Sequence, residues 1–286
     1  MTRNPIILDT DIGTNIDDAY ALVLAAVSPE VDLRGVTTVG TGSDRRAELA
    51  REILGLLNRR DVPVYPGAER SLGGAPILND IPENGTKSAA NPFIVTGMAQ
   101  KPRAKLVCVG PLTNVATALR ELHASKRERL SILAVAGNLG PPKRDTNSST
   151  DMTAAREILS HSARIRFLGL NVTGETSMTY EQLEMIELIR KPLPELIARL
   201  HRDYLSKVGQ TSATLHDPVA VAAIAKPQLV RFRRAIASVD EEDHMLRIKP
   251  GLYGNCETAS WLDRIGFQSF FWERILSAMD GRRIAG

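Results

Sequence analysis

Short apolar runs alternate with helix-like segments along the first 170 residues of the chain. Strands are predicted at residues 5–8, 33–39, 62–65, 106–109, 131–136 and 165–170. Helices are predicted between them at residues 17–27, 44–57, 114–122 and 153–160. Strands and helices that alternate at this spacing are typical of an α/β fold, so we predict a Rossmann-like, open and mostly parallel central sheet flanked by helices.

The second part of the chain is richer in helix patterns. Helices are predicted at residues 180–189, 194–205, 218–224 and 267–279, and strands at 229–239 and 245–248. Two segments rich in Gly, Pro, Asn and Ser, residues 71–91 and 137–149, are predicted to be loops. Loops that follow the carboxyl ends of strands bind ligands in open α/β sheets. The chain shows no internal repeat and no linker, so one domain over residues 1–286 is expected.

The composition excludes several classes of protein. The 36 Lys and Arg residues against 33 Asp and Glu give a net charge of +3, and aromatic residues make up 5%. A nucleic-acid partner needs a basic surface or stacking platforms, so it is not expected. Cys108 and Cys256 are too few for a disulfide framework or a zinc cluster. Asp9 interrupts the apolar stretch near the N-terminus and no run of 18 apolar residues occurs, so we expect a cytoplasmic protein without a membrane span.

Four carboxylates fall within the ten residues 9–18, at the end of a predicted strand and the start of a predicted helix. They are Asp9, Asp11, Asp17 and Asp18. Carboxylates this close repel one another and raise each other's pKa unless a cation or hydrogen bonds offset the repulsion. Gly13 gives the backbone the freedom to fold back between them. A divalent cation with oxygen ligands is the simplest way to hold such a group together.

The acidic segment also has interpretations other than a cation site. Asp17 and Asp18 could serve only the helix N-terminus, but that role does not explain Asp9 and Asp11. A calcium-binding EF-hand loop needs a Glu at its twelfth position, where Tyr20 stands. A phosphatase of the haloacid-dehalogenase type also begins with a strand followed by Asp-x-Asp. It remains an alternative, although that motif places Gly where this chain has Ile12.

A second group of interest is His216-Asp217-Pro218, which precedes an apolar helix. Asp before Pro at a helix start is typical of a capping residue. The neighbouring His is a residue that a metal-assisted hydrolase could use as an acid. Both interpretations stay open from these three residues alone.

Together, the segments DTDIGTNIDDAYAL and HDPVAVA resemble those of the inosine-uridine-type nucleoside hydrolases. Residues 107–116 (VCVGPLTNVA) resemble the VGPLTN segment of that family, residues 169–173 (GLNVT) its GLDVT strand, and residues 267–276 its closing aromatic helix. The resemblance implies the nucleoside hydrolase fold and calcium-dependent hydrolysis of the N-glycosidic bond of a ribonucleoside. It also implies a homo-oligomer, either a dimer or a tetramer.

The resemblance further implies roles for individual residues. The implied Ca²⁺ ligands are Asp11, Asp18, Asp217 and the backbone carbonyl of Val109. Asp11 would deprotonate the attacking water, and His216 would protonate the leaving base. Asp17 would hold ribose hydroxyls, and Asp9 would shape the site. Positive charge develops on the sugar as the bond breaks, as in glycosidases, and carboxylates stabilise it.

The sequence departs from the family where sugar and base are contacted. Residues 145–151 stand in place of the segment E-[FY]-N-x-x-x-D, so Asn147 is expected to contact the ribose 5′-hydroxyl and Asp145 to replace the Glu. Thr146 replaces an aromatic residue, and Asn138 could replace a sugar-contacting Asn. Residues 40–43 lack the usual Asn, and residues 83–85 are at most a remnant of the HG-x-[DS]-G motif. The base therefore stays open, and a non-catalytic ribosyl-binding protein is a second alternative.

Overall fold

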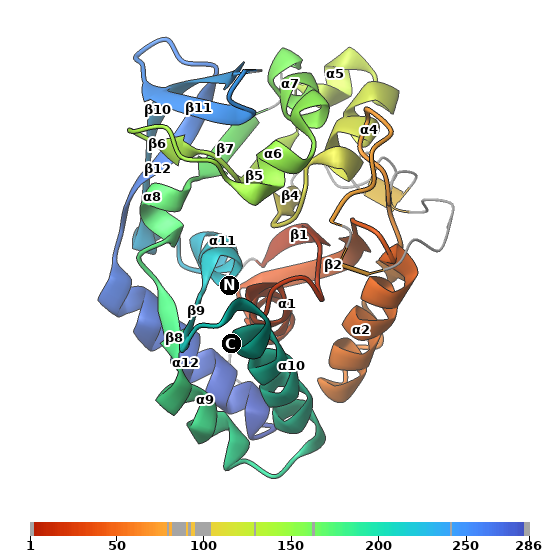
Figure 1. Cartoon of the computed structure of the whole chain (residues 1–286), viewed down its shortest axis with the longest axis vertical. Helices are drawn as coiled ribbons and strands as arrows, with labels where there is room; N and C mark the ends of the chain where they lie inside the picture. Colours follow the sequence, from red (N-terminus) through yellow and green to blue (C-terminus); the bar gives the residue numbers. More distant parts are fainter. Residues whose placement is uncertain are drawn as a thin grey trace.

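A ten-stranded sheet forms the centre of the molecule (Figure 1). The computed structural model describes residues 3–78, 80–81, 90, 93–94, 104–128, 130–161, 164–240 and 242–282. In spatial order the strands are β3 (Val64–Tyr65), β2 (Val31–Thr38), β1 (Asn4–Thr10), β4 (Lys105–Cys108), β5 (Ser131–Val135), β7 (Arg164–Leu168), β12 (Cys256–Leu262), β10 (Val230–Asp240), β11 (Met245–Pro250) and β6 (Asn138–Leu139). The first seven run parallel to one another, and β10 is antiparallel to both of its neighbours.

Helices cover the sheet, and a second sheet of two short strands lies beside them. The longer helices are α1 (Asp17–Val27), α2 (Ser43–Leu56), α4 (Thr113–Glu121), α7 (Met152–Ser160), α9 (Tyr180–Glu187), α10 (Pro192–Val208), α11 (His216–Ala225) and α12 (Arg264–Met279). The short elements are α5 (Ala124–Arg127), α6 (Thr146–Thr150), α8 (Leu170–Thr173), the 3₁₀ turn Pro227–Leu229, and the strand pair β8 (Ser177–Thr179) and β9 (Ser212–Thr214). In Figure 1, α4, α5 and α7 lie toward the top of the view and α9, α10 and α12 toward the bottom.

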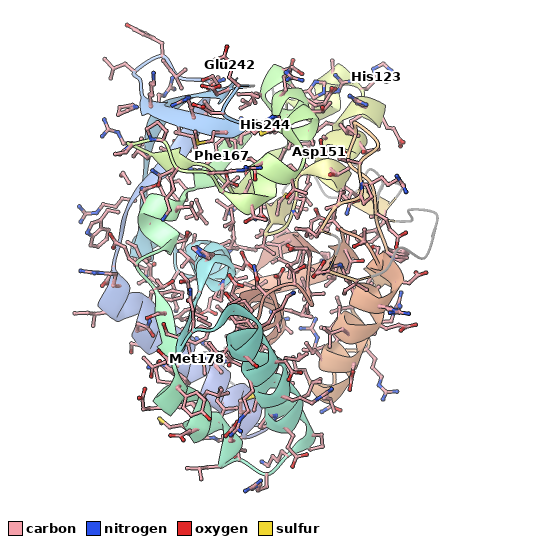
Figure 2. All side chains as sticks on the ribbon, viewed as in Figure 1. His123, Asp151, Phe167, Met178, Glu242 and His244 are labelled. Carbon is pink, nitrogen blue, oxygen red and sulfur yellow. The ribbon has the colours of Figure 1, made fainter. Side chains whose placement is uncertain are left out.

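Apolar side chains pack on both faces of the sheet. In β1, Ile6 and Leu8 belong to one buried cluster, and Ile7 belongs to the other. Helices α1, α2, α10, α11 and α12 contribute to the first cluster, whereas α4 and α7 contribute to the second. Figure 2 labels one member of each cluster, Met178 and Phe167. Burial on both faces explains why β1 is a continuous apolar run rather than an alternating one.

The predicted fold class is confirmed, and each helix and strand predicted from the hydrophobic pattern is present to within three residues of its predicted ends. Two local predictions were wrong. Residues 137–149 are not purely loop, because β6 pairs with β11 and α6 begins after a capping Asp145. Residues 169–173 are not a strand, because the N–H groups of Val172 and Thr173 donate to the carbonyl of Gly169 in a helical turn. Strands β8, β9 and β12 were not predicted.

Some sequence expectations fall at the edge of the described chain. In the segment 71–91, the described residues 71–78 and 80–81 form turns, with one isolated bridge between Arg70 and Pro76. The expected motif remnant at residues 83–85 lies outside the described residues. Both cysteines are free and buried, as expected for packing residues. Within the described part of the chain, none of the helices is both long enough and apolar enough to span a membrane.

Candidate active site

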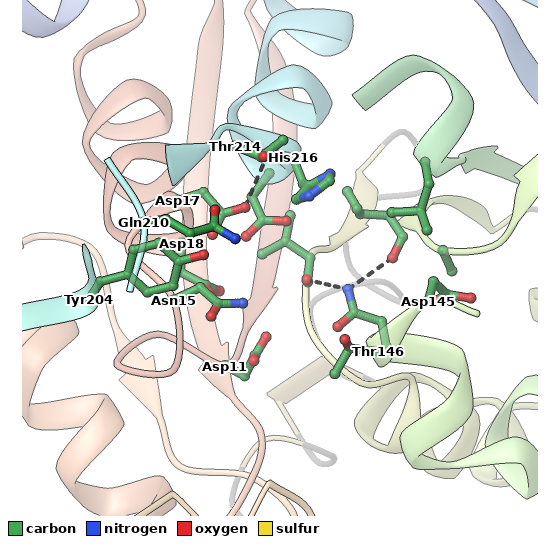
Figure 3. Close-up of a pocket in the computed structure, with 16 residues that line it drawn as sticks. Asp11, Asn15, Asp17, Asp18, Asp145, Thr146, Tyr204, Gln210, Thr214 and His216 are labelled. Atoms are coloured by element: carbon green, nitrogen blue, oxygen red, sulfur yellow. Dashed lines mark hydrogen bonds between the residues drawn. The ribbon is translucent and has the colours of Figure 1, made fainter. Parts of the chain in front are cut away.

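A cavity lies at the point where the sheet reverses its winding. β2 pairs with β1 on one side, and β4 pairs with β1 on the other. The carboxyl ends of β1 and β4 therefore form a topological switch point, where open α/β sheets bind ligands. Asp11 follows β1 and Val109 follows β4, and both line a cavity of about 260 Å³. Figure 3 shows this cavity and the side chains that surround it.

Three buried carboxylates meet at this cavity. Asp17 and Asp18 begin α1, and Asp217 lies in the first turn of α11, which packs against α1. One carboxylate oxygen from each of the three residues lies within 4.8 Å of the other two. Their exposed fractions are only 4%, 1% and 4%. A group of buried oxygen donors in this arrangement fits a hard divalent cation.

Burial raises the pKa of all three carboxyl groups. For Asp18 and Asp217, loss of hydration is the largest cause and repulsion from neighbouring carboxylates adds to it, so both pKa values lie well above the ordinary value. The pKa of Asp17 rises to about 6, because burial outweighs the backbone N–H groups that bind its carboxylate. The ionised forms are therefore costly here unless a positive charge stabilises them.

Asp11 lines the same cavity from the loop after β1. Among the described residues, the close group of carboxylate oxygens contains Asp17, Asp18 and Asp217 but not Asp11. Burial raises the pKa of Asp11 to about 7, and repulsion from Asp17 adds to this shift, whereas the nearby Arg46 lowers it. A carboxylate with a pKa near neutrality is suited to accept a proton at neutral pH.

Asp9 is fully buried at the end of β1 and is not among the residues that line the cavity. Its Oδ1 accepts hydrogen bonds from Asn114 Nδ2 at 2.8 Å and from Thr37 Oγ1 at 2.5 Å. Its Oδ2 has no partner among the described residues. Burial raises its pKa to about 7. Asp9 thus connects β1 with β2 and α4 behind the cavity.

His216 begins α11 and lines the cavity beside Asp217. Its Nδ1 lies 2.8 Å from Thr173 Oγ1, and its backbone N–H donates to Asp17 Oδ2 at 3.1 Å. Asp17 therefore binds the start of α11, while the N-cap of its own helix is Ile16 without a side-chain cap. Burial lowers the pKa of His216 to about 4, and the charge of Lys143 adds to this shift. The imidazole is neutral at pH 7.

Asn147 is held at the opposite wall by two backbone carbonyls. Its Nδ2 donates to the Val109 oxygen at 2.6 Å and to the Val135 oxygen at 2.9 Å. The Val109 carbonyl, implied as a metal ligand, thus already accepts one hydrogen bond. A carbonyl oxygen has two lone pairs, so a second contact is open to it.

The other two predicted sugar contacts have structural partners of their own. Asp145 caps α6, because its Oδ1 accepts from the backbone N–H of Ser148 at 2.8 Å and its Oδ2 accepts from the Ser148 hydroxyl. Asp145 also lines the cavity, and burial raises its pKa. Asn138 donates to the Pro141 carbonyl at 2.7 Å and is not among the lining residues.

Four polar residues that line the cavity were not singled out from the sequence. They are Asn15, Tyr204, Gln210 and Thr214. Asn15 lies inside the acidic segment, so its position there was a usable signal. Tyr204 lies on α10 and Gln210 just after it, and neither belongs to a motif that would have marked it. Figure 3 shows these side chains together with Asp17 and Asp18 on one side of the cavity, across from Asp145 and Thr146.

The raised pKa values predict how stability depends on pH when no divalent cation is bound. The native carboxyl groups keep protons that the unfolded chain releases above about pH 4, so the free energy of unfolding falls as pH rises toward about 7. In chelator, we expect a Tm lower by more than about 5 °C at pH 8 than at pH 5. Calorimetry measures this difference, and equal Tm values at the two pH values would contradict it.

Comparisons with known proteins agree with the motifs. The family model described as inosine-uridine preferring nucleoside hydrolase matches residues 6–262. The pyrimidine-specific ribonucleoside hydrolase RihA of Shewanella baltica strain OS155 is 33% identical over 305 residues, which cover 93% of this chain and 94% of that protein. The RihA protein of Escherichia coli O1:K1 is 34% identical over 257 residues, covering 79% of this chain and 80% of that protein.

Solved structures show the same fold. The purine-preferring ribonucleoside hydrolase from Gardnerella vaginalis has a TM-score of 0.82 at 23% identity, and the match covers 96% of this chain and 99% of that one. A plant nucleoside hydrolase has a TM-score of 0.80 at 21% identity, and the match covers 96% and 99%. At these identities the likeness supports the architecture described above.

Proposed function

The chain belongs to the inosine-uridine preferring nucleoside hydrolase family and is an N-ribohydrolase, and we propose that it hydrolyses ribonucleosides in a Ca²⁺-dependent reaction in the cavity between α1 and α11. The observation that supports this most strongly is the group of Asp17, Asp18 and Asp217, with Asp11 in the same cavity. The family assignment rejects the haloacid-dehalogenase-like phosphatase. It also argues against the non-catalytic ribosyl-binding alternative, which the assay below tests directly.

The group of Asp17, Asp18 and Asp217 fits Ca²⁺ because its buried oxygens repel one another when ionised, and Asp11 lines the same cavity. The proposed ligands are Asp11, Asp18, Asp217 and the Val109 carbonyl. When bound, Ca²⁺ supplies Lewis-acid activation of water and neutralises the carboxylates. One oxygen of Asp18 already accepts the Thr10 hydroxyl, which fixes the orientation of this carboxylate.

Side chains of the protein accept the proton, bind the sugar and stabilise the charge that develops on it. Asp11, a carboxylate that lines the cavity, accepts the proton of the attacking water. Asp17 accepts hydrogen bonds from the ribose hydroxyls, and its contact with the His216 backbone keeps it in place. The ionised carboxylates stabilise the positive charge that develops on the sugar as the base departs.

His216 and Asn147 act at the two ends of the substrate. In the tautomer whose Nδ1 accepts from the Thr173 hydroxyl, Nε2 of His216 carries the proton and can donate a hydrogen bond to the departing base. Asn147 uses both amide hydrogens for backbone carbonyls, so its Oδ1 is the atom left to accept a bond from the ribose 5′-hydroxyl. Asp145 supports this wall as a helix cap and faces the sugar from it.

Pyrimidine ribonucleosides are the proposed substrate class. The curated relatives that match at 33–36% identity are named pyrimidine-specific, whereas the purine-preferring structure is 23% identical. Purine ribonucleosides are therefore the comparison substrates.

We also expect residues 1–286 to act as one domain.

A riboside panel with controlled Ca²⁺ tests the proposal. Purified protein is stripped with chelator and then assayed with uridine, cytidine, inosine and adenosine, and release of reducing sugar is measured with and without added Ca²⁺. We expect turnover of uridine or cytidine, at least about 100-fold loss in chelator, and recovery when Ca²⁺ returns. Binding of ribosides without cleavage of any of them would instead favour the ribosyl-binding alternative.

A further inference from the structure

Arg46 is buried next to the loop that carries Asp11. It belongs to α2, and its side chain has no exposed surface. A buried guanidinium loses its hydration and is stable only when hydrogen bonds and a counter-charge replace the lost water. The partners of Arg46 therefore show which parts of the molecule it holds together.

One nitrogen of Arg46 binds the acidic loop at three points. Its Nη1 donates to the Asp11 carbonyl at 2.6 Å, to the Ile12 carbonyl at 3.2 Å and to Thr14 Oγ1 at 2.7 Å. Gly13 lies between the last two acceptors with a φ of 100°, a left-handed conformation that favours glycine. The loop thus folds around the guanidinium.

The remaining nitrogens bind the neighbouring loops. Nε donates to the Thr41 carbonyl at 3.0 Å, and Nη2 makes an ion pair with Asp80 at 2.7 Å. Gly40 packs so closely that a Cβ atom there would lie 3.2–3.4 Å from the guanidinium. The planar group therefore joins the loop after β1, the loop after β2 and Asp80 in one fixed arrangement.

We propose that Arg46 is a positioning residue for the cation site, because its guanidinium fixes the backbone of the loop that carries Asp11 and leads into Asp17 and Asp18. This inference rests on the proposed Ca²⁺ dependence. The hydrogen-bond geometry of Arg46 and its positive charge affect Ca²⁺ binding in opposite directions. Ordering the loop strengthens Ca²⁺ binding, whereas a positive charge beside the site weakens it by repulsion. The Arg46 guanidinium makes five hydrogen bonds in a fixed plane, so we expect its ordering of the loop to outweigh its repulsion of Ca²⁺.

Two substitutions of Arg46 distinguish the effect of its hydrogen-bond geometry from the effect of its charge. Arg46→Lys keeps the charge but cannot reproduce the fork, and Arg46→Met removes both. We expect each variant of the full chain to bind Ca²⁺ about 10- to 100-fold more weakly than the wild type. Isothermal titration with Ca²⁺ alone measures this without substrate. Arg51→Met is the matched control, since Arg51 lies on the same helix and donates to the Val64 carbonyl at 2.7 Å; its affinity should not change.

Thr14→Val serves as a milder variant in case both Arg46 variants unfold, which circular dichroism would reveal. It keeps Arg46 but removes the Thr14 hydroxyl, which accepts from Arg46 and also hydrogen-bonds the Asp11 carboxyl group, so about threefold weaker Ca²⁺ binding is expected. Wild-type affinity in Arg46→Lys, in Arg46→Met or, if those do not fold, in Thr14→Val would overturn the inference. A wild-type chain that binds no Ca²⁺ would overturn the cation site itself, and the role of Arg46 with it.

Discussion

Asp11→Ala should lower kcat/KM for the best ribonucleoside substrate by at least about 10³-fold, whereas His216→Ala should lower it by less than about 100-fold. Asp11 lines the cavity and would accept the proton of the attacking water for every substrate. His216 has a pKa of about 4, so at pH 7 it is neutral and offers only a hydrogen bond. The value of that bond varies with the base that leaves.

Steady-state assays of both variants on one pyrimidine and one purine ribonucleoside measure this difference. Asp61→Asn is a suitable control, because Asp61 is exposed and its partner is Arg59, at 2.9 Å. The loss in His216→Ala should differ between the two substrates, while the loss in Asp11→Ala should be similar for both. Equal losses in the two variants would contradict the assignment of the proton acceptor.

Much of the cation site could be predicted because its carboxylates follow a strand and begin a helix. A strand that ends at Thr10, just after Asp9, and a helix that starts at Asp17 place the acidic segment at the carboxyl edge of the sheet. Asp217 is remote in the sequence, and only its resemblance to a family motif connected it with that segment. The structure supplies the physical reason, since α1 and α11 pack side by side with their N-termini at one cavity.

The missed elements depend on pairing that no local pattern encodes. β12 has the mixed sequence CETASWL, yet it lies between β7 and β10 and continues the parallel part of the sheet. β6 has only two residues and exists because β11 offers it an edge. β8 and β9 have three residues each and pair across a gap that contains two helices. Such short strands are stabilised by their partners rather than by their own sequences.

Arg46 shows why part of the site could not be seen in the sequence. In the segment SDRRAELAREILGL, it lies among charged residues that look like the solvent-exposed face of an amphipathic helix. The structure buries it completely because the loops after β1 and β2 supply acceptors for its hydrogens. Asn147 differs in another way: its place in a motif was visible, but the use of its amide group to bind Val109 and Val135 was not.

Asp217→Asn should stabilise the Ca²⁺-free protein while it removes activity. The carboxyl group of Asp217 has a pKa well above its ordinary value, because it is buried and surrounded by Asp17, Asp18 and Asp11. A neutral amide of the same shape needs neither a buried charge nor the uptake of a proton on folding, so we expect a Tm about 3–6 °C higher in chelator at pH 8. Loss of a cation ligand should lower kcat/KM by at least about 100-fold. Such a gain in stability at the expense of function is common at active sites.

Asp151→Asn should instead lower the stability of the protein. Asp151 is equally buried, at 3% exposed, but accepts hydrogen bonds from Thr113 Oγ1 at 2.7 Å and from the backbone N–H groups of Leu72 at 2.8 Å and Ala154 at 3.0 Å. An amide cannot accept all three bonds, so its Tm should fall by about 3 °C or more, with or without Ca²⁺. Added Ca²⁺ should raise the Tm of Asp151→Asn as it raises that of the wild type, but leave that of Asp217→Asn unchanged. If both variants shifted in the same direction, the carboxylates at the cavity would not be held under mutual repulsion, and the argument for a cation there would lose its electrostatic basis.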